Sequence, residues 1–322
     1  MRAVHVNAYG PPEVLEPGEA DVPVAGAGEV VIDVEYAGVN FAEVMFRRGQ
    51  FEIGVPHVPG LEASGTVREV GPDVAGLVPG QRVAALTLAG GGYAERVVAP
   101  AALTVALDDG VPGDLGAAFP CNVTVALGLL RDAARLREGE SVLVTGAAGG
   151  VGTAAAQIAR RMGASAVYGV ASTPDKAAYA ADFGYDHVFT YEDLVGRVRE
   201  RTGGTGVDVL LDAVGGPVRK EAMDLLAFFG RHVVFGDAAQ EDAEFTGVGL
   251  WSSSRSVGGY NLGGMVAARP DLARDRLEEA ARLVADGAVR IDVTTFRLDE
   301  AAKAHELLES RRSTGKYVLS TR

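Results

Sequence analysis

The sequence predicts an α/β protein with two domains, one made mainly of β-strands and one built around a doubly wound parallel sheet. Up to about Pro120 the chain consists of short strand-like runs separated by glycine and proline turns. After Pro120, apolar strand-like runs alternate with helical segments, which is the pattern of βαβ units in a parallel sheet. A length of 322 residues also favours about two domains.

Four segments carry the strand pattern of the first part. They are "EVVIDVEYAGVN", "EASGTVREVGPDV", "GQRVAAL" and "YAERVVA", and glycine or proline lies close to each of them. The segment "FAEVMFRRG" is different, because its apolar residues have helical spacing and a glycine ends it. We therefore expect a β domain with one short helix.

The second part contains the strands of the parallel sheet. "NVTVALGLLRDAARL" precedes them with helical spacing, and segments such as "PDKAAYAADFG" and "LVGRVRERTGG" separate them as helices. The six predicted strands are residues 141–145, 166–170, 187–190, 207–212, 231–235 and 256–260. Six is the number that a doubly wound dinucleotide-binding domain requires.

The last part of the chain is a long amphipathic helix, "DLARDRLEEAARLVADG", followed by a strand, a helix and a strand in "VTTFRLDEAAKAHELLESRRSTGKYVLST". Since the parallel sheet already has six strands, we expect these last strands to join the N-terminal β domain. The predicted domains are therefore residues 1–120 with 289–322, and residues 121–288.

The stretch "VLVTGAAGGVGTAAAQIARRMG" has the form of a dinucleotide-binding turn between a strand and a helix. The usual motif is G-x-G-x-x-G; here Ala147 stands at the first glycine, while Gly149 and Gly152 fill the second and third. We expect Gly146 to supply the tight turn. Backbone N–H groups at the start of such a helix bind a pyrophosphate.

The residues after the second strand of the sheet predict which dinucleotide binds. Sites selective for NAD usually place an acidic residue there, about 20 residues after the motif. Here "AVYGV" is followed by "ASTPDK", which offers Ser172 and Lys176, and Asp175 is expected on the first helical turn. Hydroxyl and ammonium groups suit a 2′-phosphate, so the sequence favours NADPH. The alternative for Lys176 is a solvated helix residue.

Composition excludes several classes of function. A net charge of −13 opposes general binding to nucleic acid. The single cysteine, Cys121, can form no intramolecular disulfide and no cysteine cluster for zinc. The sequence contains no apolar run of about 18 residues, so no membrane span is expected. The N-terminus lacks the apolar core of a signal peptide. We expect a cytoplasmic protein.

Several segments together resemble the zinc-independent quinone oxidoreductases, the zeta-crystallin-like family of the medium-chain dehydrogenase/reductase superfamily. They are "VNFAEVMFRRGQF", "VPGLEASGTVREVG", "GGYAERVVAP", "GESVLVTGAAGGVGTAAAQIARRMGA", "GVDVLLDAVGG", "GRHVVFG" and "STGKYVLS". The resemblance implies a GroES-like β domain plus a Rossmann domain. It also implies NADPH-dependent reduction of a quinone or enone, and a homodimer that pairs the 256–260 edge strands of two copies.

The resemblance also implies the roles of individual residues. Asn40 and Thr124 would lie near the nicotinamide and would serve as catalytic donors to the acceptor oxygen. The cofactor-binding residues would be Asn40, Phe51, Thr124, Gly146, Ala148, Gly149, Gly150, Val151, Ser172, Lys176, Tyr191, Phe235, Gly236 and Lys316. The alternative for Asn40 is a turn residue that bonds to its own backbone.

Two positions depart from the family. Ala126 stands where an aromatic residue is common, and Phe51 stands where a tyrosine is frequent. Both changes leave the expected cleft open and apolar, which suits a bulky, flat acceptor.

The sequence predicts no metal site. Zinc-dependent relatives use a cysteine in the segment that reads "VNFAE" here, and a Gly-His-Glu segment that reads "PGLEA" here. Leu61 cannot bind zinc, and Glu62 alone is not a site. His57 and Cys121 are better interpreted as structural residues.

Three functions remain open from the sequence. The first is an NADPH-dependent quinone or enone reductase. The second is a nucleotide-binding protein without turnover. The third is an enoyl reductase acting on a carrier-bound or biosynthetic intermediate, for which "RVRER" and "ESRRS" could dock an acidic carrier, although such runs are more often solvated helix faces.

Overall fold

The computed structural model of the chain describes residues 1–51 and 53–322 and divides into two compact units. The terminal unit comprises Met1–Thr124 and Gly263–Arg322, and the central unit comprises Val125–Leu262. The second boundary lies before helix α11 (Pro270–Ala285), whereas the sequence placed it at residue 288. The reason is that α11 packs on the terminal unit, where Arg274 Nη1 donates hydrogen bonds of 3.2 Å to the carbonyl groups of Ala101 and Ala102.

The terminal unit contains most of the β structure. Its strands are β1 (Arg2–Val6), β2 (Leu15–Glu19), β3 (Glu29–Val39), β4 (Glu62–Val70), β5 (Arg82–Leu86), β6 (Arg96–Pro100), β7 (Thr104–Ala106), β14 (Val293–Arg297) and β15 (Lys316–Ser320). Its helices are α1 (Phe41–Arg47), α2 (Gly113–Gly116), α11 and α12 (Ala301–Glu309), with the short turns η1 (Pro12–Val14), η2 (Ala101–Leu103) and η4 (Leu298–Glu300). Helices α3 (Asn122–Leu127) and α10 (Leu262–Ala268) cross the unit boundaries.

The main sheet of this unit joins the two ends of the chain. Its strand order is β14-β15-β3-β4-β5-β7, with β6 also paired to β3, while β1 and β2 form a separate ribbon. Strand β15 runs antiparallel to β3 and places Tyr317 opposite Val39. This pairing confirms that the last strands join the N-terminal β structure.

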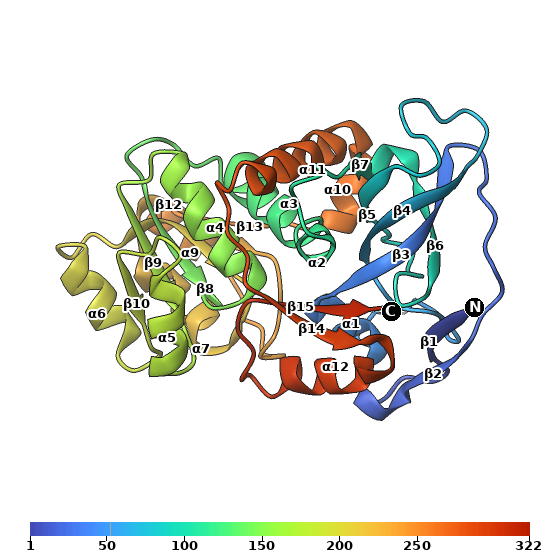
Figure 1. Cartoon of the computed structure of the whole chain (residues 1–322). Helices are drawn as coiled ribbons and strands as arrows, with labels where there is room; N and C mark the ends of the chain where they lie inside the picture. Colours follow the sequence, from blue (N-terminus) through green and yellow to red (C-terminus); the bar gives the residue numbers. More distant parts are fainter. Residues whose placement is uncertain (52) are drawn as a thin grey trace. The chain divides into compact units, whose positions relative to one another are not determined.

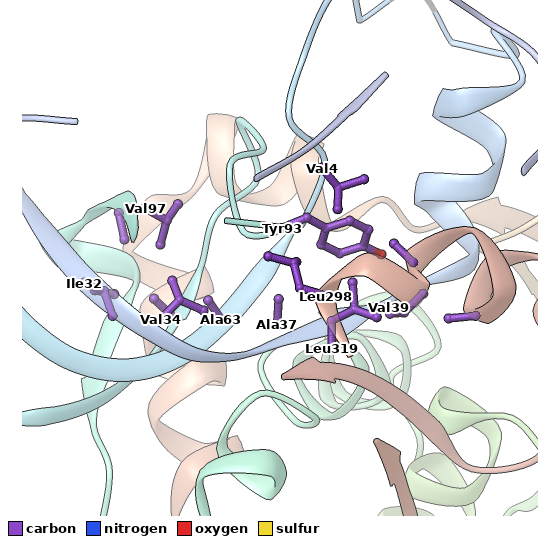
Figure 2. Close-up of a cluster of buried hydrophobic side chains, with 14 of the residues drawn as sticks. Val4, Ile32, Val34, Ala37, Val39, Ala63, Tyr93, Val97, Leu298 and Leu319 are labelled. Atoms are coloured by element: carbon purple, nitrogen blue, oxygen red, sulfur yellow. The ribbon is translucent and has the colours of Figure 1, made fainter. Parts of the chain in front are cut away.

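The apolar core of the terminal unit lies against β3 and β4. Alternate residues of β3, including Ile32 and Val34, point to one face, as the two-residue period of a strand requires. Tyr93 belongs to the same core, and Figure 2 shows its ring near Val4 and Leu298. The ring is fully buried, so its hydroxyl must find a hydrogen-bond partner inside the protein.

The central unit is the predicted doubly wound domain. Its strands are β8 (Ser141–Thr145), β9 (Ala166–Val170), β10 (His187–Phe189), β11 (Val207–Asp212), β12 (Leu226–Val234) and β13 (Ser256–Gly259), and all six are parallel. Its helices are α4 (Gly150–Arg161), α5 (Pro174–Ala181), α6 (Leu194–Arg201), α7 (Gly216–Lys220), α8 (Ala222–Leu225) and α9 (Gly247–Ser253), with a π-helical turn η3 (Gly128–Ala133) after α3.

Five of these strands match the predicted ones to within a residue, and β12 begins earlier than expected. Leu226 already pairs with Val207, ahead of an irregularity in the register of β11 and β12. The segment "LAFFGRH" contains a glycine and lacks the alternation of apolar and polar residues, so the sequence pattern did not indicate this early start.

Both faces of the parallel sheet are covered. Leu143 and Leu210 belong to an apolar cluster with residues of α6, α7 and α8. Their neighbours Val142 and Val144 point to the opposite face and are equally buried. Helices α4 and α5 pack on β8, β9 and β10 (Figure 1). Burial on both faces explains the continuous apolar runs in the sequence.

The strand order β10-β9-β8-β11-β12-β13 reverses direction between β8 and β11. In open parallel sheets, ligands bind outside the carboxyl ends of the strands at such a reversal. We therefore expect a ligand to bind at the segments that follow β8, β9, β11 and β12.

Candidate active site

Three polar side chains meet where β3 ends in the terminal unit. Asn40 follows β3, while Glu62 and Lys316 begin β4 and β15. Since β3 is antiparallel to both neighbours, its carboxyl end meets their amino ends. Lys316 Nζ lies 2.6 Å from Glu62 Oε1 and 2.6 Å from Asn40 Oδ1, and Asn40 Nδ2 lies 2.8 Å from Glu62 Oε1. We call this set the strand-end cluster.

The cluster is a buried ion pair with an amide bridging its two charges. Glu62 is fully buried and Lys316 is 3% exposed, so each charge would be very unfavourable without the other. Cys121 N–H donates to the second carboxylate oxygen of Glu62 at 2.8 Å. Gly38 is required beside it, because a Cβ there would lie 2.4 Å from Glu62 Oε1 and from the Ala117 carbonyl oxygen.

Asn40 bonds through its side chain to the side chains of other segments, whereas the alternative considered from the sequence was a bond to its own backbone. Its backbone N–H donates to Glu43 Oε2 at 2.6 Å at the start of α1, while its side chain contacts Glu62 and Lys316. Asn40 is only partly buried. Its amide can still use one more N–H and one more lone pair, so it can contact a ligand while the cluster holds it in place.

Thr124 lies one helical turn beyond Cys121 in α3. Its side chain is fully buried, and its Oγ1 has no hydrogen-bond partner in the described structure. A buried hydroxyl without a partner costs about 1–3 kcal/mol. This unsatisfied donor fits a residue whose partner is a bound ligand.

A second buried chain of polar groups supports the same segments. Glu43 accepts hydrogen bonds from Leu61 N–H at 2.8 Å and from Tyr93 Oη at 3.0 Å. Tyr93 Oη also lies 3.1 Å from Nε2 of His305. Burial raises the pKa of Glu43 to about 7, against the opposing effects of the backbone N–H groups of Asn40 and Leu61, of Lys316 and of Tyr93. Burial lowers the pKa of His305 to about 3, so this imidazole is neutral.

The two remaining predicted residues of the terminal unit, Lys316 and Phe51, have different surroundings. Lys316 was expected beside a cofactor, and two of its three N–H donors are used inside the strand-end cluster. Phe51 is half exposed and packs edge-to-face on Phe46, with ring centroids 5.8 Å apart.

In the central unit, the glycine turn has the geometry that a phosphate site requires. Gly146 follows β8 with a φ of +64°, which confirms that it makes the turn. A Cβ at Gly152 would lie 2.4 Å from the Gly146 carbonyl oxygen, so only glycine allows α4 to pack this closely on β8. Gly149 is the N-cap of α4 and provides no capping side chain, which leaves the helix N-terminus available to an anion.

The segment after β9 carries the residues expected at a 2′-phosphate. Ser172 is exposed and Lys176 is partly buried on the first turn of α5. Thr173 caps this helix, and its Oγ1 accepts the Lys176 backbone N–H at 3.3 Å. Burial lowers the pKa of the Lys176 side chain. Tyr191, between β10 and α6, is about one-third exposed.

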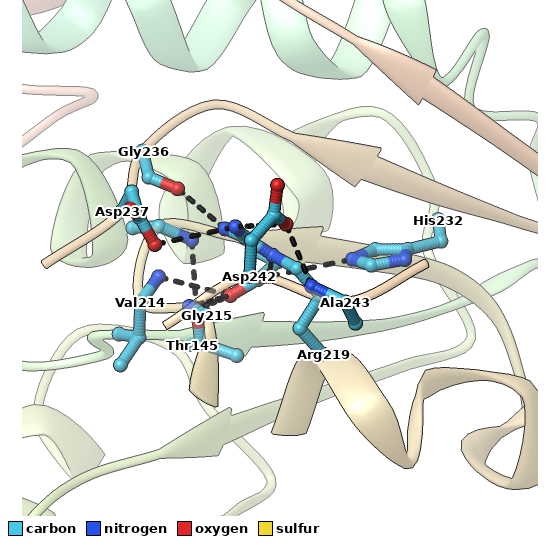
Figure 3. Close-up of polar contacts among 11 residues, drawn as sticks. Thr145, Val214, Gly215, Arg219, His232, Gly236, Asp237, Asp242 and Ala243 are labelled. Atoms are coloured by element: carbon cyan, nitrogen blue, oxygen red, sulfur yellow. Dashed lines mark hydrogen bonds and ion pairs between the residues drawn. The ribbon is translucent and has the colours of Figure 1, made fainter. Parts of the chain in front are cut away.

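The sequence analysis missed a charged cluster at the ends of β11 and β12. Asp212 ends β11 and pairs with Arg219, which also reaches the carbonyl oxygen of Gly236 (Figure 3). An aspartate closing the apolar run "VDVLLD" was the available signal. Nothing in the sequence pattern marked Glu43, Tyr93 and His305 as partners, because they come from separate segments.

Among the described residues, no group of three or more histidine, cysteine, aspartate or glutamate side chains could hold a metal ion. His57 is partly buried and its backbone forms a bridge with Val6. Cys121 is buried, and burial raises the pKa of its thiol well above the usual value. No helix in the described part of the chain is long and apolar enough to cross a bilayer.

Two domain families match the chain. The alcohol dehydrogenase GroES-like domain matches residues 26–109, and the zinc-binding dehydrogenase family matches residues 150–286. With the fold described above, this combination defines a medium-chain dehydrogenase/reductase.

Individual relatives narrow this class. A quinone oxidoreductase of Pseudomonas aeruginosa is 34% identical over 325 residues, covering 99% of both chains. A mycobacterial protein solved in complex with NADPH is 33% identical, with a TM-score of 0.94 over 99% of this chain and 100% of that one. The chain belongs to the quinone oxidoreductase family of this superfamily.

A third relative is a much larger protein, and this chain matches only one stretch of it. The mycocerosic acid synthase-like polyketide synthase of Mycolicibacterium smegmatis is 33% identical over 303 residues, which is 91% of this chain and 14% of that protein.

The buried Glu43 carboxyl predicts a specific pH dependence of stability. Its pKa is about 7 in the native protein and near the ordinary value of 4.5 when unfolded, so the native state retains a proton that the unfolded state loses between these values. The stability that this proton provides is complete below pH 4.5 and lost as the pH rises through 7. Relative to Glu43→Gln, the free energy of unfolding of the wild type should fall by roughly 3 kcal/mol across this window.

Urea unfolding of both proteins at several pH values between 4.5 and 8 measures this difference. The titration of His305 affects both proteins, so the comparison isolates Glu43. Glu306→Gln, which changes an exposed glutamate of α12, serves as the control and should follow the wild type. Parallel curves for the wild type and Glu43→Gln would contradict the prediction.

Proposed function

We propose that this chain binds NADPH and transfers hydride from it to a quinone or an α,β-unsaturated carbonyl acceptor without a metal ion. The strand-end cluster is the observation that carries this proposal. It occupies the segments in which zinc-dependent relatives provide cysteine and histidine ligands. Here Asn40 and Leu61 offer no such ligands, and the Lys316 ammonium already neutralises Glu62.

The residues present fit NADPH. Gly146, Gly152 and the uncapped N-terminus of α4 form a cradle that an anion can enter. We assign each part of the cofactor to its own set of residues. Gly146, Ala148, Gly149, Gly150 and Val151 would hold the pyrophosphate, Ser172, Lys176 and Tyr191 the 2′-phosphate, and Asn40, Phe51, Thr124, Phe235, Gly236 and Lys316 the nicotinamide half. NADPH, when bound, supplies the hydride.

The chain's own residues stabilise the charge that develops on the acceptor. A conjugated acceptor spreads negative charge over an enolate or a hydroquinone anion, so neutral hydrogen-bond donors are sufficient. Thr124 Oγ1 has no competing partner in the described structure. The Asn40 amide is held by Glu62 and Lys316, so it does not have to reorganise when the charge forms. The protein therefore orients the acceptor with two fixed, neutral donors.

An enoyl reductase acting on a carrier-bound intermediate is the second candidate. The similarity to a stretch of a polyketide synthase supports it. One of the two basic segments that could dock a carrier, "RVRER", lies on α6, where Arg199 forms an ion pair with Asp224 at 3.3 Å. This ion pair favours the solvated-face interpretation of that segment.

The test is NADPH oxidation, followed by loss of its absorbance, with quinones, simple enones and enoyl thioesters of a pantetheine carrier, in buffer containing a strong chelator. We expect turnover of quinones or simple enones that the chelator does not affect. A kcat/KM that is higher for the carrier thioester would establish the second candidate. Binding without turnover of any acceptor would identify a nucleotide-binding protein, and activity that needs added zinc would overturn the proposal.

Thr124→Val tests the catalytic donor directly. Because the Thr124 hydroxyl has no hydrogen-bond partner among the described residues, Thr124→Val removes an unsatisfied buried group and should raise the free energy of unfolding by about 1–3 kcal/mol. At the same time kcat should fall roughly 10- to 1000-fold, with much less effect on NADPH affinity. Asn40→Ala should lower kcat in the same range.

Thr104→Val is the matched control, because this buried threonine donates to the Pro100 carbonyl oxygen at 2.9 Å. It should lose about 1 kcal/mol of stability and keep its kcat. Steady-state kinetics and urea unfolding of the variants give both quantities. An unchanged kcat in Thr124→Val would show that this hydroxyl is not a donor.

Lys176→Ala tests the choice of cofactor. If Lys176 binds the 2′-phosphate, the variant should bind NADPH about 5- to 30-fold more weakly and NADH almost as before. Lys303→Ala removes an exposed lysine of the terminal unit and should change neither affinity. Calorimetric titration with both cofactors gives the ratio. Equal losses for NADPH and NADH would remove Lys176 from the phosphate site.

We propose a homodimer formed through the edge of the central sheet. Strand β13 is one of the two edge strands of this sheet and carries no charged residue between Ser256 and Gly259. Exposed apolar side chains are present on β12 (Phe228 and Phe229) and on α9 (Val248 and Trp251), and Trp251 is 79% exposed in the single chain. The two segments meet where the Phe229 N–H donates to the Ser254 carbonyl oxygen at 3.0 Å. A face of this kind is suited to pairing with a second copy.

Trp251 is the only tryptophan of the chain, so its emission reports on this face. Light scattering at micromolar concentration should give twice the mass of one chain, and dilution should shift the Trp251 emission to longer wavelength. Phe228→Asp should produce a monomer with the emission of an exposed tryptophan. A wild-type protein that is monomeric at these concentrations would contradict the dimer.

A further inference from the structure

Arg219 of α7 connects its helix to the end of β11 and to the segment after β12, at the carboxyl edge of the central sheet. Arg219 lies on α7 and is 2% exposed. Nε donates to Asp212 Oδ2 at 2.8 Å, and Nη2 donates to the Gly236 carbonyl oxygen at 2.5 Å. Nη1 reaches Asp242 Oδ1 at 3.0 Å and Asp237 Oδ1 at 3.3 Å (Figure 3). Four of its five N–H donors are therefore used within the chain.

Asp212 fixes the first of these segments. Burial alone would raise the pKa of this carboxyl, but the His232 ring, with Nε2 at 3.5 Å from Oδ2, and hydrogen bonds from Gly215, Arg219 and Val214 hold it well below its usual value. The backbone N–H groups of Val214 and Gly215 donate to Oδ1 at 2.9 and 3.0 Å. The loop after β11 is thus folded around a permanently charged aspartate, which Arg219 neutralises.

The same aspartate is tied to the strand that carries the glycine turn. Thr145, the last residue of β8, donates from Oγ1 to Asp212 Oδ1 at 3.1 Å and accepts the Ala213 N–H at 2.9 Å. A Cβ at Gly146 would lie 3.8 Å from Val214 Cγ2. The loop after β11 therefore borders the glycine turn.

These segments lie on one side of the strand-order reversal. The residues proposed for the 2′-phosphate follow β9, on the other side of β8. In a doubly wound sheet of this order, the two halves of a dinucleotide bind on opposite sides of the reversal. If the adenosine half lies at β9, the nicotinamide half lies over the segments after β11 and β12, which are the segments that Arg219 connects.

We propose that Arg219 is a positioning residue: it fixes the loops after β11 and β12 in the shape that binds the nicotinamide half of NADPH, and it does not contact the cofactor. An arginine is required because its planar fork reaches acceptors in three directions, whereas a lysine offers one charged centre. The inference rests on the proposed NADPH function, because it assumes that the adenosine half lies at β9.

Binding of NADPH and of 2′,5′-ADP, which represents only the adenosine half, separates positioning from general loss of structure. Arg219→Met should weaken NADPH by about tenfold or more and leave 2′,5′-ADP within about twofold of the wild type. Arg219→Lys should recover only part of the NADPH affinity. A general loosening of the unit would weaken both ligands equally.

Arg231→Met is the matched control. Arg231 also pairs with a carboxylate in the central unit, through Nη1 to Glu140 Oε1 at 3.0 Å, away from the carboxyl edge. This variant should bind both ligands as the wild type does. If Arg219→Met does not fold, Asp242→Asn removes one contact of the fork from an 80% exposed carboxylate and should show a smaller loss confined to NADPH.

Each outcome decides the matter. Loss of NADPH affinity alone supports the positioning role. Equal loss for both ligands, or an unchanged NADPH affinity in Arg219→Met and Asp242→Asn, overturns it while the proposed function stands. A wild-type protein that binds neither NADPH nor 2′,5′-ADP would overturn the proposed function itself.

Discussion

The structure depends on one constraint, which is that a charge buried in a protein must be paired with an opposite charge. Each unit contains one such pair at the ends of its central strands. In the terminal unit, Glu62 is paired with Lys316, and in the central unit Asp212 is paired with Arg219. All four side chains are nearly or fully buried. Because removing one partner would leave an uncompensated charge, each pair holds its segments in a single arrangement.

Each pair also holds neutral groups that the proposed chemistry would use. Glu62 and Lys316 bond to the side chain of Asn40, and Glu62 accepts the N–H of Cys121, which begins the segment leading to Thr124. One buried carboxylate thus contacts Asn40 directly and anchors the backbone just before Thr124. Asp212 orders the loop after β11 in the same manner, next to the glycine turn. Neutral donors held by paired charges are suited to an acceptor that spreads its own negative charge.

Much of this architecture could be predicted from the sequence. Apolar periodicity gave the strands of the central sheet, and the change from "VLVT" to glycines gave the turn at Gly146, because these signals are local. The two charge pairs could not be predicted in this way. Asn40, Glu62 and Lys316 are brought together by the pairing of β3 with β4 and β15, which no local pattern specifies. In particular, the role of Glu62 cannot be predicted without knowing that Lys316, 254 residues later, is its partner.

A double-mutant cycle on the Glu62–Lys316 pair tests the central claim most directly. The free energy of unfolding would be measured in urea at pH 8 for the wild type, Glu62→Gln, Lys316→Met and the double variant. If the pair is a buried and mutually dependent contact, each single change should cost about 3–5 kcal/mol, and the double variant should lose much less than their sum. Additive losses, or single variants as stable as the wild type, would contradict the account.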